Sequence, residues 1–314
     1  MPDLVRRARD GEVRAVARLV SLVEDESPVL REVMAALAPH TGRAHVIGIT
    51  GAPGVGKSTS TNALVRAYRE QGRRVGVIAV DPSSPFSGGA LLGDRVRMGD
   101  HATDDGVYIR SMAARGHLGG LSWTTPQAMR VLDAAGYDVV LVETVGVGQS
   151  EVEVAGLADT TVVLLAPGMG DGIQAAKAGI LEVGDVYVVN KADRDGARQV
   201  AQDLRAMLSL GERTHDAWRP PIRRTTAQSG EGVPEVVEAL DEHRAWLEET
   251  GALRRRRVRR ARAEVEAIAV ADLRRRWDAT AAGHDGLDDL AGRVVDGALD
   301  PYAAADELLA VVQG

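Results

Sequence analysis

The sequence predicts an α/β protein, with a doubly wound, mostly parallel sheet and helical extensions at both ends of the chain. Short β-branched segments alternate with stretches of helical periodicity, at residues 45–50, 74–80, 107–110, 138–143, 161–166, 185–190 and 222–226. Several of these segments are apolar throughout, as in strands buried on both faces. Polar motifs follow their carboxyl ends, which is where ligands bind in such sheets.

Helical periodicity marks both ends of the chain. Between Leu4 and Leu37 apolar residues recur at helical spacing with a break near Pro28, which predicts two helices. After the last strand segment one helix is expected to end near Gly251, and a longer helix follows it. We therefore expect three parts: an N-terminal helical extension (1–44), a central α/β domain (45–250) and a C-terminal helical arm (251–314).

The composition narrows the class of protein. The chain has 314 residues, 45% of them hydrophobic, and no cysteine, which excludes disulfides, thiolate metal sites and a cysteine nucleophile. Its seven histidines are scattered without the spacing of metal ligands. No apolar run reaches the roughly 20 residues that span a bilayer, and the start does not resemble a signal peptide, so we expect a cytoplasmic location. The net charge of -7 gives no general attraction to nucleic acid.

A glycine-rich motif follows the first strand segment. Residues 51–58 read Gly-Ala-Pro-Gly-Val-Gly-Lys-Ser and stand before a helical stretch, which is the pattern of a P-loop. Glycines there let backbone amides surround phosphate oxygens, Lys57 neutralises the β and γ oxygens, and the Ser58 hydroxyl binds Mg²⁺. The predicted phosphate-binding residues are Gly51, Ala52, Pro53, Gly54, Val55, Gly56, Lys57, Ser58 and Thr59.

Acidic residues end two neighbouring strand segments. Asp81 follows the apolar run 76–80, and Glu143 follows the run 139–142. Magnesium prefers oxygen ligands and usually keeps some of its water, so carboxylates at this edge of the sheet suit a magnesium-nucleotide site. Ser58, Asp81 and Glu143 are the predicted metal ligands.

A second motif selects the base. Asn190-Lys-Ala-Asp193 ends another strand segment, and the Asp193 carboxylate can accept the N1 and N2 hydrogens of guanine, which adenine lacks. Asn190 is expected on the other side of the base, Lys191 along the ring, and a backbone amide of Thr226 or Ala227 at O6. The sequence therefore predicts a protein with the P-loop GTPase fold, which binds GTP and hydrolyses it to GDP.

The catalytic region departs from the common pattern. Glu143-Thr-Val-Gly146 stands where most GTPases have Asp-x-x-Gly, and the glutamine that commonly follows this glycine is replaced by Val147. Since that glutamine orients the attacking water, we expect slow hydrolysis unless a partner completes the site.

Three further segments resemble the MeaB/ArgK family of G-protein chaperones: 80–98, 143–151 and 167–182. The resemblance covers about residues 1–250 closely and implies several roles. Asp94 matches a switch I carboxylate near magnesium, which adds it to the predicted metal ligands. Glu143 to Gly146 match switch II, and Asp171, Gln174 and Lys177 match a third, partner-responsive switch. The candidate catalytic residues are Lys57, Asp94, Glu143 and Gly146.

The resemblance also implies partners. Family members deliver adenosylcobalamin to methylmalonyl-CoA mutase under control of GTP and protect or reactivate that enzyme. This implies an adenosylcobalamin-dependent acyl-CoA mutase as the partner, stimulation of GTP hydrolysis by it, and a homodimer formed through the C-terminal helices.

Two other functions stay open, a nickel metallochaperone-type GTPase and a P-loop kinase. The absence of cysteine disfavours the first and Asp193 disfavours the second.

An arginine run, Arg254 to Arg257 with Arg259, Arg260 and Arg262, could bind RNA or a membrane, but nearby aromatic residues are scarce. We expect it to form a solvated or dimer-flanking face, with no nucleic acid or membrane partner.

Overall fold

The computed structural model describes residues 2–82, 99–101, 103–114, 124–144, 150–168, 182–209, 217–279 and 285–313. The chain divides into two compact units, Met1–Arg257 and Val258–Gly314. The three-part division expected from the sequence remains a prediction.

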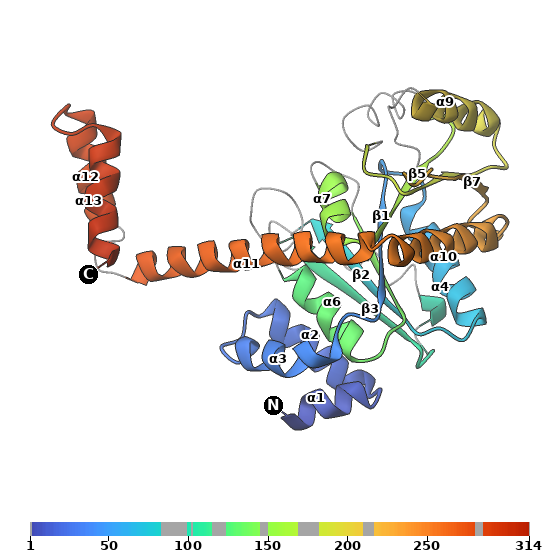
Figure 1. The fold of residues 1–314 in the computed structure, drawn as a ribbon, viewed down its shortest axis with the longest axis horizontal. Helices are drawn as coiled ribbons and strands as arrows, with labels where there is room; N and C mark the ends of the chain where they lie inside the picture. The colour runs from blue at the N-terminus through green and yellow to red at the C-terminus, as the bar shows by residue number, and fades with distance from the viewer. Residues whose placement is uncertain are drawn as a thin grey trace. The chain divides into compact units, whose positions relative to one another are not determined.

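The first unit is built on a seven-stranded sheet in the order β3-β2-β4-β1-β5-β6-β7, and every pairing in it is parallel (Figure 1). This confirms the predicted α/β fold. The strands are β1 (His45–Thr50), β2 (Val75–Pro82), β3 (Val107–Ala114), β4 (Val139–Glu143), β5 (Thr160–Leu165), β6 (Val186–Asn190) and β7 (Ile222–Thr225).

Helices cover both faces of the sheet. The helices on one side of the sheet are α1 (Pro2–Arg9), α2 (Val13–Glu24), α3 (Leu30–Leu37), α6 (Thr125–Ala134), α7 (Ser150–Leu157) and α9 (Ala197–Ser209). The other face packs against α4 (Lys57–Glu70) and α10 (Val233–Glu249). Along β4, Val140 and Val142 join the first core and Val139 and Leu141 the second. Burial on both faces explains why this segment is apolar throughout.

The N-terminal extension differs from the prediction, because it contains three helices where the periodicity indicated two. Gly11 adopts a φ of +89°, a left-handed conformation that ends α1 and turns the chain into α2. Leu19, Val23 and Val33 are fully buried and belong to the same core as the strand residues of β2 and β4. The extension therefore shares the core on this side of the sheet, where α2 and α3 contact α6. A 3-10 turn, η1 (Ala38–His40), follows α3 within the extension, and a second, η2 (Gly99–His101), lies in the α/β part of the chain.

The helix α11 (Ala252–Ala279) begins in the first unit. In the second unit α12 (Asp285–Val295) and α13 (Pro301–Gln313) pack on each other through Leu290, Ala304 and Leu308. Val258 and Val265, two apolar residues of α11, are 56% and 67% exposed. None of the described helices is long and apolar enough to cross a bilayer.

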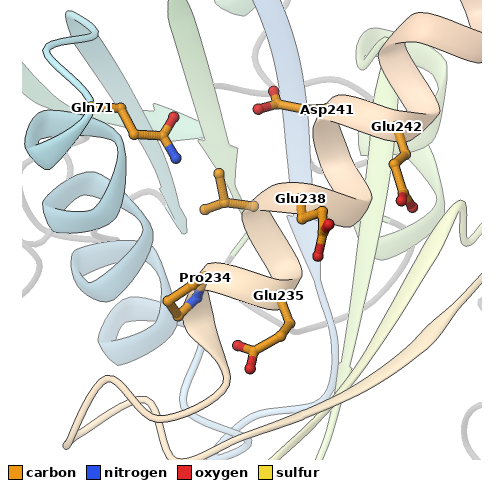
Figure 2. Close-up of a pocket in the computed structure, with 7 residues that line it drawn as sticks. Gln71, Pro234, Glu235, Glu238, Asp241 and Glu242 are labelled. Atoms are coloured by element: carbon orange, nitrogen blue, oxygen red, sulfur yellow. The ribbon is translucent and has the colours of Figure 1, made fainter.

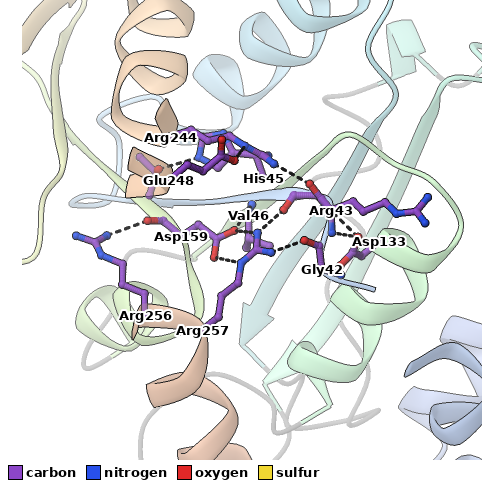
Figure 3. Close-up of polar contacts among 12 residues, drawn as sticks. Gly42, Arg43, His45, Val46, Asp133, Asp159, Arg244, Glu248, Arg256 and Arg257 are labelled. Carbon is purple, nitrogen blue, oxygen red and sulfur yellow. Dashed lines mark hydrogen bonds and ion pairs between the residues drawn. The ribbon is translucent and has the colours of Figure 1, made fainter. Parts of the chain in front are cut away.

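Two arginines of the arginine run form ion pairs and are only partly exposed, which differs from the solvated or dimer-flanking face that we expected. Arg256 makes two hydrogen bonds of 2.7 Å to the carboxylate of Asp185. Arg257 reaches the carboxylate of Asp159 at 2.7 and 3.1 Å and the carbonyl oxygen of Ala44 at 2.8 Å (Figure 3). Asp159 and Asp185 precede β5 and β6, so these pairs fasten the start of α11 to the amino edge of the sheet. The spacing of charges alone gave no sign of these partners.

A buried histidine pair extends this amino-edge cluster. The hydroxyl of Thr160 lies 2.7 Å from Nε2 of His45 and 2.8 Å from Nδ1 of His243, and all three side chains are buried. Nε2 of His243 lies 3.4 Å from the carboxylate of Asp185. Burial lowers the pKa of His45 to about 3 and that of His243 to about 4, so both rings are neutral at pH 7.

Candidate functional site

The P-loop occupies residues 51–56, between the end of β1 and the start of α4. Gly54 and Gly56 take φ angles of +79° and +95°, which residues with side chains rarely adopt. A Cβ atom on Gly56 would also lie 2.5 Å from Nδ2 of Asn190. Glycine at this position therefore lets the loop pass directly against the residue predicted to meet the base.

Lys57 is the buried first residue of α4. Its Nζ donates hydrogen bonds to the carbonyl oxygens of Gly51 at 2.6 Å and Ala52 at 3.2 Å. The ammonium group is thus held inside the turn of the loop, next to the positive end of the α4 dipole. This combination of charge and dipole suits an anion such as a phosphate.

Glu143, the last residue of β4, is buried against α4. Its Oε1 accepts a hydrogen bond from the Ser58 hydroxyl at 2.6 Å, and its Oε2 accepts one from the Thr61 hydroxyl at 2.8 Å. Ser58 and Thr61 are three residues apart on α4, so both hydroxyls lie on the same face of the helix. The structure therefore joins two predicted metal ligands, Ser58 and Glu143, in one cluster.

The chemistry of this cluster fits magnesium. A hydroxyl and a carboxylate are hard oxygen donors, and both come from positions at the carboxyl edge of the sheet. Among the residues that the structure describes, no group of three or more His, Asp or Glu side chains could hold a metal ion alone. Magnesium that arrives with a nucleotide takes its other ligands from phosphate and water, so one or two side chains suffice.

Asp81 belongs to β2, beside the strand that carries Glu143. Ala79 of β2 is in register with Glu143 of β4, so the backbone of Asp81 lies two residues further toward the carboxyl edge. The side chain of Asp81 lies outside the described part of the structure. The same is true of every atom of Asp94, Gly146, Asp171, Gln174 and Lys177.

Asn190 ties two loops together at the end of β6. Its Nδ2 donates a 2.9 Å hydrogen bond to the carbonyl oxygen of Val55 in the P-loop. Its Oδ1 accepts hydrogen bonds from the Ala227 amide at 3.1 Å and from the Thr225 hydroxyl at 3.2 Å. The side chain thus links the phosphate-binding loop to the loop that follows β7.

The other residues of the predicted base site lie beside Asn190. Lys191 has a φ of +57°, and its Nζ donates to the carbonyl oxygen of Gly54 at 2.6 Å. Asp193 is exposed in the turn that follows. The Thr226 amide donates to the carbonyl oxygen of Glu231 at 3.0 Å. The structure brings these residues to the same edge as the P-loop, and their contacts with guanine remain a prediction.

Two residues of this site were missed by the sequence analysis. Thr61 binds Glu143 and Thr225 binds Asn190, both through buried hydroxyls. Thr61 could have been found, because a hydroxyl one helical turn after the P-loop serine lies on the same helix face. Thr225 depends on the register of β6 with β7, in which Asn190 pairs with Thr225, and no local pattern gives that register.

A hollow of about 610 Å³ lies between the end of α4 and α10, away from the P-loop (Figure 2). Its charged lining is acidic, with side chains from Glu235, Glu238, Asp241 and Glu242. It also includes Gln71, which lies 14 residues after Lys57 and therefore roughly 20 Å away along α4. An acidic hollow at this end of the helix does not suit a nucleotide phosphate.

The model of one protein family, described as methylmalonyl-CoA mutase-associated GTPase MeaB, matches residues 16–282. The chain belongs to the MeaB family. This MeaB-family protein is a GTP hydrolase and binds guanine nucleotides, and the predicted P-loop and guanine motif fall within the matched region.

Relatives support the assignment over the full chain. A putative GTPase of Pyrococcus horikoshii is 46% identical over 314 residues, which cover 99% of this MeaB-family chain and 98% of that protein. The mitochondrial methylmalonic aciduria type A homolog of Mus musculus is 38% identical over 84% of this chain and 64% of that protein. The crystal structure of an LAO/AO transport system kinase superposes with a TM-score of 0.74 at 29% identity, covering 99% and 97% of the two chains.

Proposed function

We propose that this GTPase is a G-protein chaperone for an adenosylcobalamin-dependent acyl-CoA mutase, with methylmalonyl-CoA mutase the first candidate. The observation that carries the proposal is the match to a family named for its association with that mutase, over residues 16–282. The name of the mouse relative, which refers to methylmalonic aciduria, supports the same partner. In this role GTP binding and hydrolysis gate delivery of the cofactor and protect or reactivate the mutase.

Binding of the nucleotide is assigned to the residues at the carboxyl edge. The amides of residues 51–59 and the Lys57 ammonium bind the phosphates, which is supported by the enclosed position of Nζ inside the loop. Asn190, Lys191, Asp193, Thr226 and Ala227 form the guanine site. Asn190 also braces the two loops, through its hydrogen bonds to the carbonyl oxygen of Val55 and the amide of Ala227.

Magnesium is proposed as the cofactor of the bound nucleotide. Ser58 and Glu143 would hold it, together with Asp81 and Asp94 in the GTP-bound state. When bound, the ion supplies positive charge that stabilises the charge developing on the phosphates during hydrolysis. Gly146 is proposed as the sensor of the γ-phosphate.

The partner-dependent part of the function is assigned to Asp171, Gln174 and Lys177. We propose that the mutase contacts this segment and thereby completes a slow catalytic site. The C-terminal helices are proposed to form a homodimer, which accords with the 56% and 67% exposure of Val258 and Val265 on α11.

The test is a GTPase assay with and without purified mutase. We expect slow turnover by the protein alone and a clear acceleration by its client, with methylmalonyl-CoA and isobutyryl-CoA type mutases tried in parallel. Lys177→Ala should keep wild-type GDP affinity but lose the acceleration. If every adenosylcobalamin-dependent mutase tried leaves the rate unchanged and fails to co-purify, the chaperone role is wrong, although the GTPase activity stands.

A further inference from the structure

Thr61 lies one turn of α4 beyond the P-loop serine and outside the residues that the motifs assign. Its side chain is fully buried. The hydroxyl oxygen lies 2.8 Å from Oε2 of Glu143 and 3.0 Å from the carbonyl oxygen of Lys57. Thr61 therefore touches the carboxylate that we assign to the magnesium-nucleotide site.

The hydroxyl of Thr61 has one proton for these two acceptors. Hydrogen bonds to a charged acceptor are stronger than those to a neutral one, so an ionised Glu143 takes the proton in preference to the Lys57 carbonyl. The bond holds Oε2 of Glu143, and this fixes the plane of the carboxylate. Its other oxygen, Oε1, is then directed at the Ser58 hydroxyl, 2.6 Å away.

The length of the Glu143 side chain explains why such a bond matters. Most GTPases have an aspartate at this position, and a glutamate carries one more rotatable bond between backbone and carboxylate. Each free rotor must be ordered before the carboxylate can act at a fixed place. A buried hydroxyl on a helix is a rigid partner that can supply this order.

We propose that Thr61 is a positioning residue for GTP hydrolysis, holding the Glu143 carboxylate in the orientation that presents Oε1 to Ser58. The proposal rests on the proposed role of Glu143. Thr61 acts through Glu143, so its loss affects the catalytic step and the response to magnesium more than the binding of the nucleotide.

The first experiment removes the hydroxyl while keeping the shape of the side chain. Thr61→Val should lower kcat for GTP about tenfold, the size expected for a lost hydrogen bond to a charged group, with KM changed less than about twofold. GDP affinity measured in EDTA should stay within about twofold of wild type, while a higher magnesium concentration is needed to slow GDP release. Thr61→Ser, which restores the hydroxyl, should restore kcat.

Two further variants serve as controls for an effect of the substitution on folding. Ser60→Ala is the matched control, because Ser60 is the buried neighbour on α4 and its hydroxyl has no hydrogen-bond partner among the described residues. It should leave kcat unchanged. Thr61→Ala, which also lacks the hydroxyl and cannot clash, should repeat the effect of Thr61→Val.

A double-mutant cycle tests whether Thr61 acts through Glu143. If it does, Thr61→Val adds no further loss of kcat to a Glu143→Ala variant. If Thr61→Val lowers kcat a further tenfold in the Glu143→Ala variant, the role of Thr61 is wrong. The same holds if Thr61→Val alone has wild-type kcat while Glu143→Ala is impaired; in both cases the proposed role of Glu143 stands. Wild-type hydrolysis by Glu143→Ala overturns the proposed role of Glu143 and the inference with it.

Discussion

The carboxyl and amino edges of the sheet both bury charged side chains but hold them by different contacts. At the carboxyl edge, Lys57 donates hydrogen bonds to two carbonyl oxygens, and Glu143 accepts hydrogen bonds from two hydroxyls. At the amino edge, Arg257 and Asp159 bind each other in a two-point ion pair. The first set of contacts orients the charged groups, and the second pairs two opposite charges.

This difference in contacts predicts that substitutions at the two edges affect different properties of the protein. The charged groups of a nucleotide site must be held so that they can still bind an ion of opposite sign. A charge that is already paired has little left to offer a ligand, but removing its partner leaves an uncompensated buried ion. We therefore expect substitutions at the carboxyl edge to change nucleotide affinity, and those at the amino edge to change the free energy of unfolding.

Lys57→Ala should have the largest effect. Loss of the ammonium removes charge-assisted hydrogen bonds to the phosphates, and we expect GDP affinity to fall roughly 1,000-fold. Titration with a fluorescent GDP analogue measures it. Affinity within about threefold of wild type would show that the P-loop is not the phosphate site.

Arg257→Ala should destabilise the fold by about 3 kcal/mol, because it leaves the fully buried Asp159 without its ion-pair partner. Urea unfolding measures the loss, and GDP affinity should not change. Arg254→Ala, an exposed neighbour on α11, is the matched control and should cost less than about 0.5 kcal/mol. Equal effects of the two variants would remove the distinction between the edges.

Asp193→Asn should weaken GDP and GTP binding by roughly 10- to 100-fold, because an amide cannot accept both guanine hydrogens as a carboxylate does. Asp193 is exposed in the described structure, so the unfolding midpoint should stay the same. Asp195→Asn, an exposed acid in the same turn, is the control. Unchanged GTP affinity of the Asp193 variant would contradict the guanine assignment.

The buried histidines should give the smallest effect, a dependence of stability on pH. The pKa values of His45 and His243 are lowered to about 3 and about 4, below the value of 6.5 expected in the unfolded chain. Between pH 6.5 and these lowered pKa values the unfolded chain binds more protons than the folded chain. Stability is therefore unaffected by the two histidines above pH 6.5, and it decreases as the pH falls from 6.5 toward 4 for His243 and toward 3 for His45. Urea unfolding at pH 7.5 and 5.5 should show this decrease. The decrease in the free energy of unfolding should be smaller in His243→Gln than in His40→Gln, a control variant at a histidine outside the cluster. Equal decreases in the two variants would exclude the buried histidines as the cause of the pH dependence.

Much of the carboxyl edge could be predicted from the sequence because its motifs are local. The run from Gly51 to Ser58 and the string from Asn190 to Asp193 each occupy a strand end and the turn after it. The strands themselves are confirmed for the same reason, since uninterrupted apolar runs such as 139–142 mark burial on both faces.

The amino edge could not be predicted, because its contacts join distant parts of the chain. Arg257 meets Asp159 across 98 residues and His45 meets Thr160 across 115. From charge alone, Arg256 and Arg257 were indistinguishable from Arg254, which is exposed. The third N-terminal helix was missed because α1 and α2 continue one apolar periodicity across the turn at Gly11.

Amide hydrogen exchange with and without magnesium and GDP tests the division between the two edges most directly. We predict that the nucleotide slows exchange in residues 51–59, 190–193 and 226–227 at the carboxyl edge. Exchange in residues 42–46, 159–161 and 254–257 at the amino edge should stay the same. Slowing centred on the amino edge, with no change in the P-loop, would contradict the assignment of the nucleotide site.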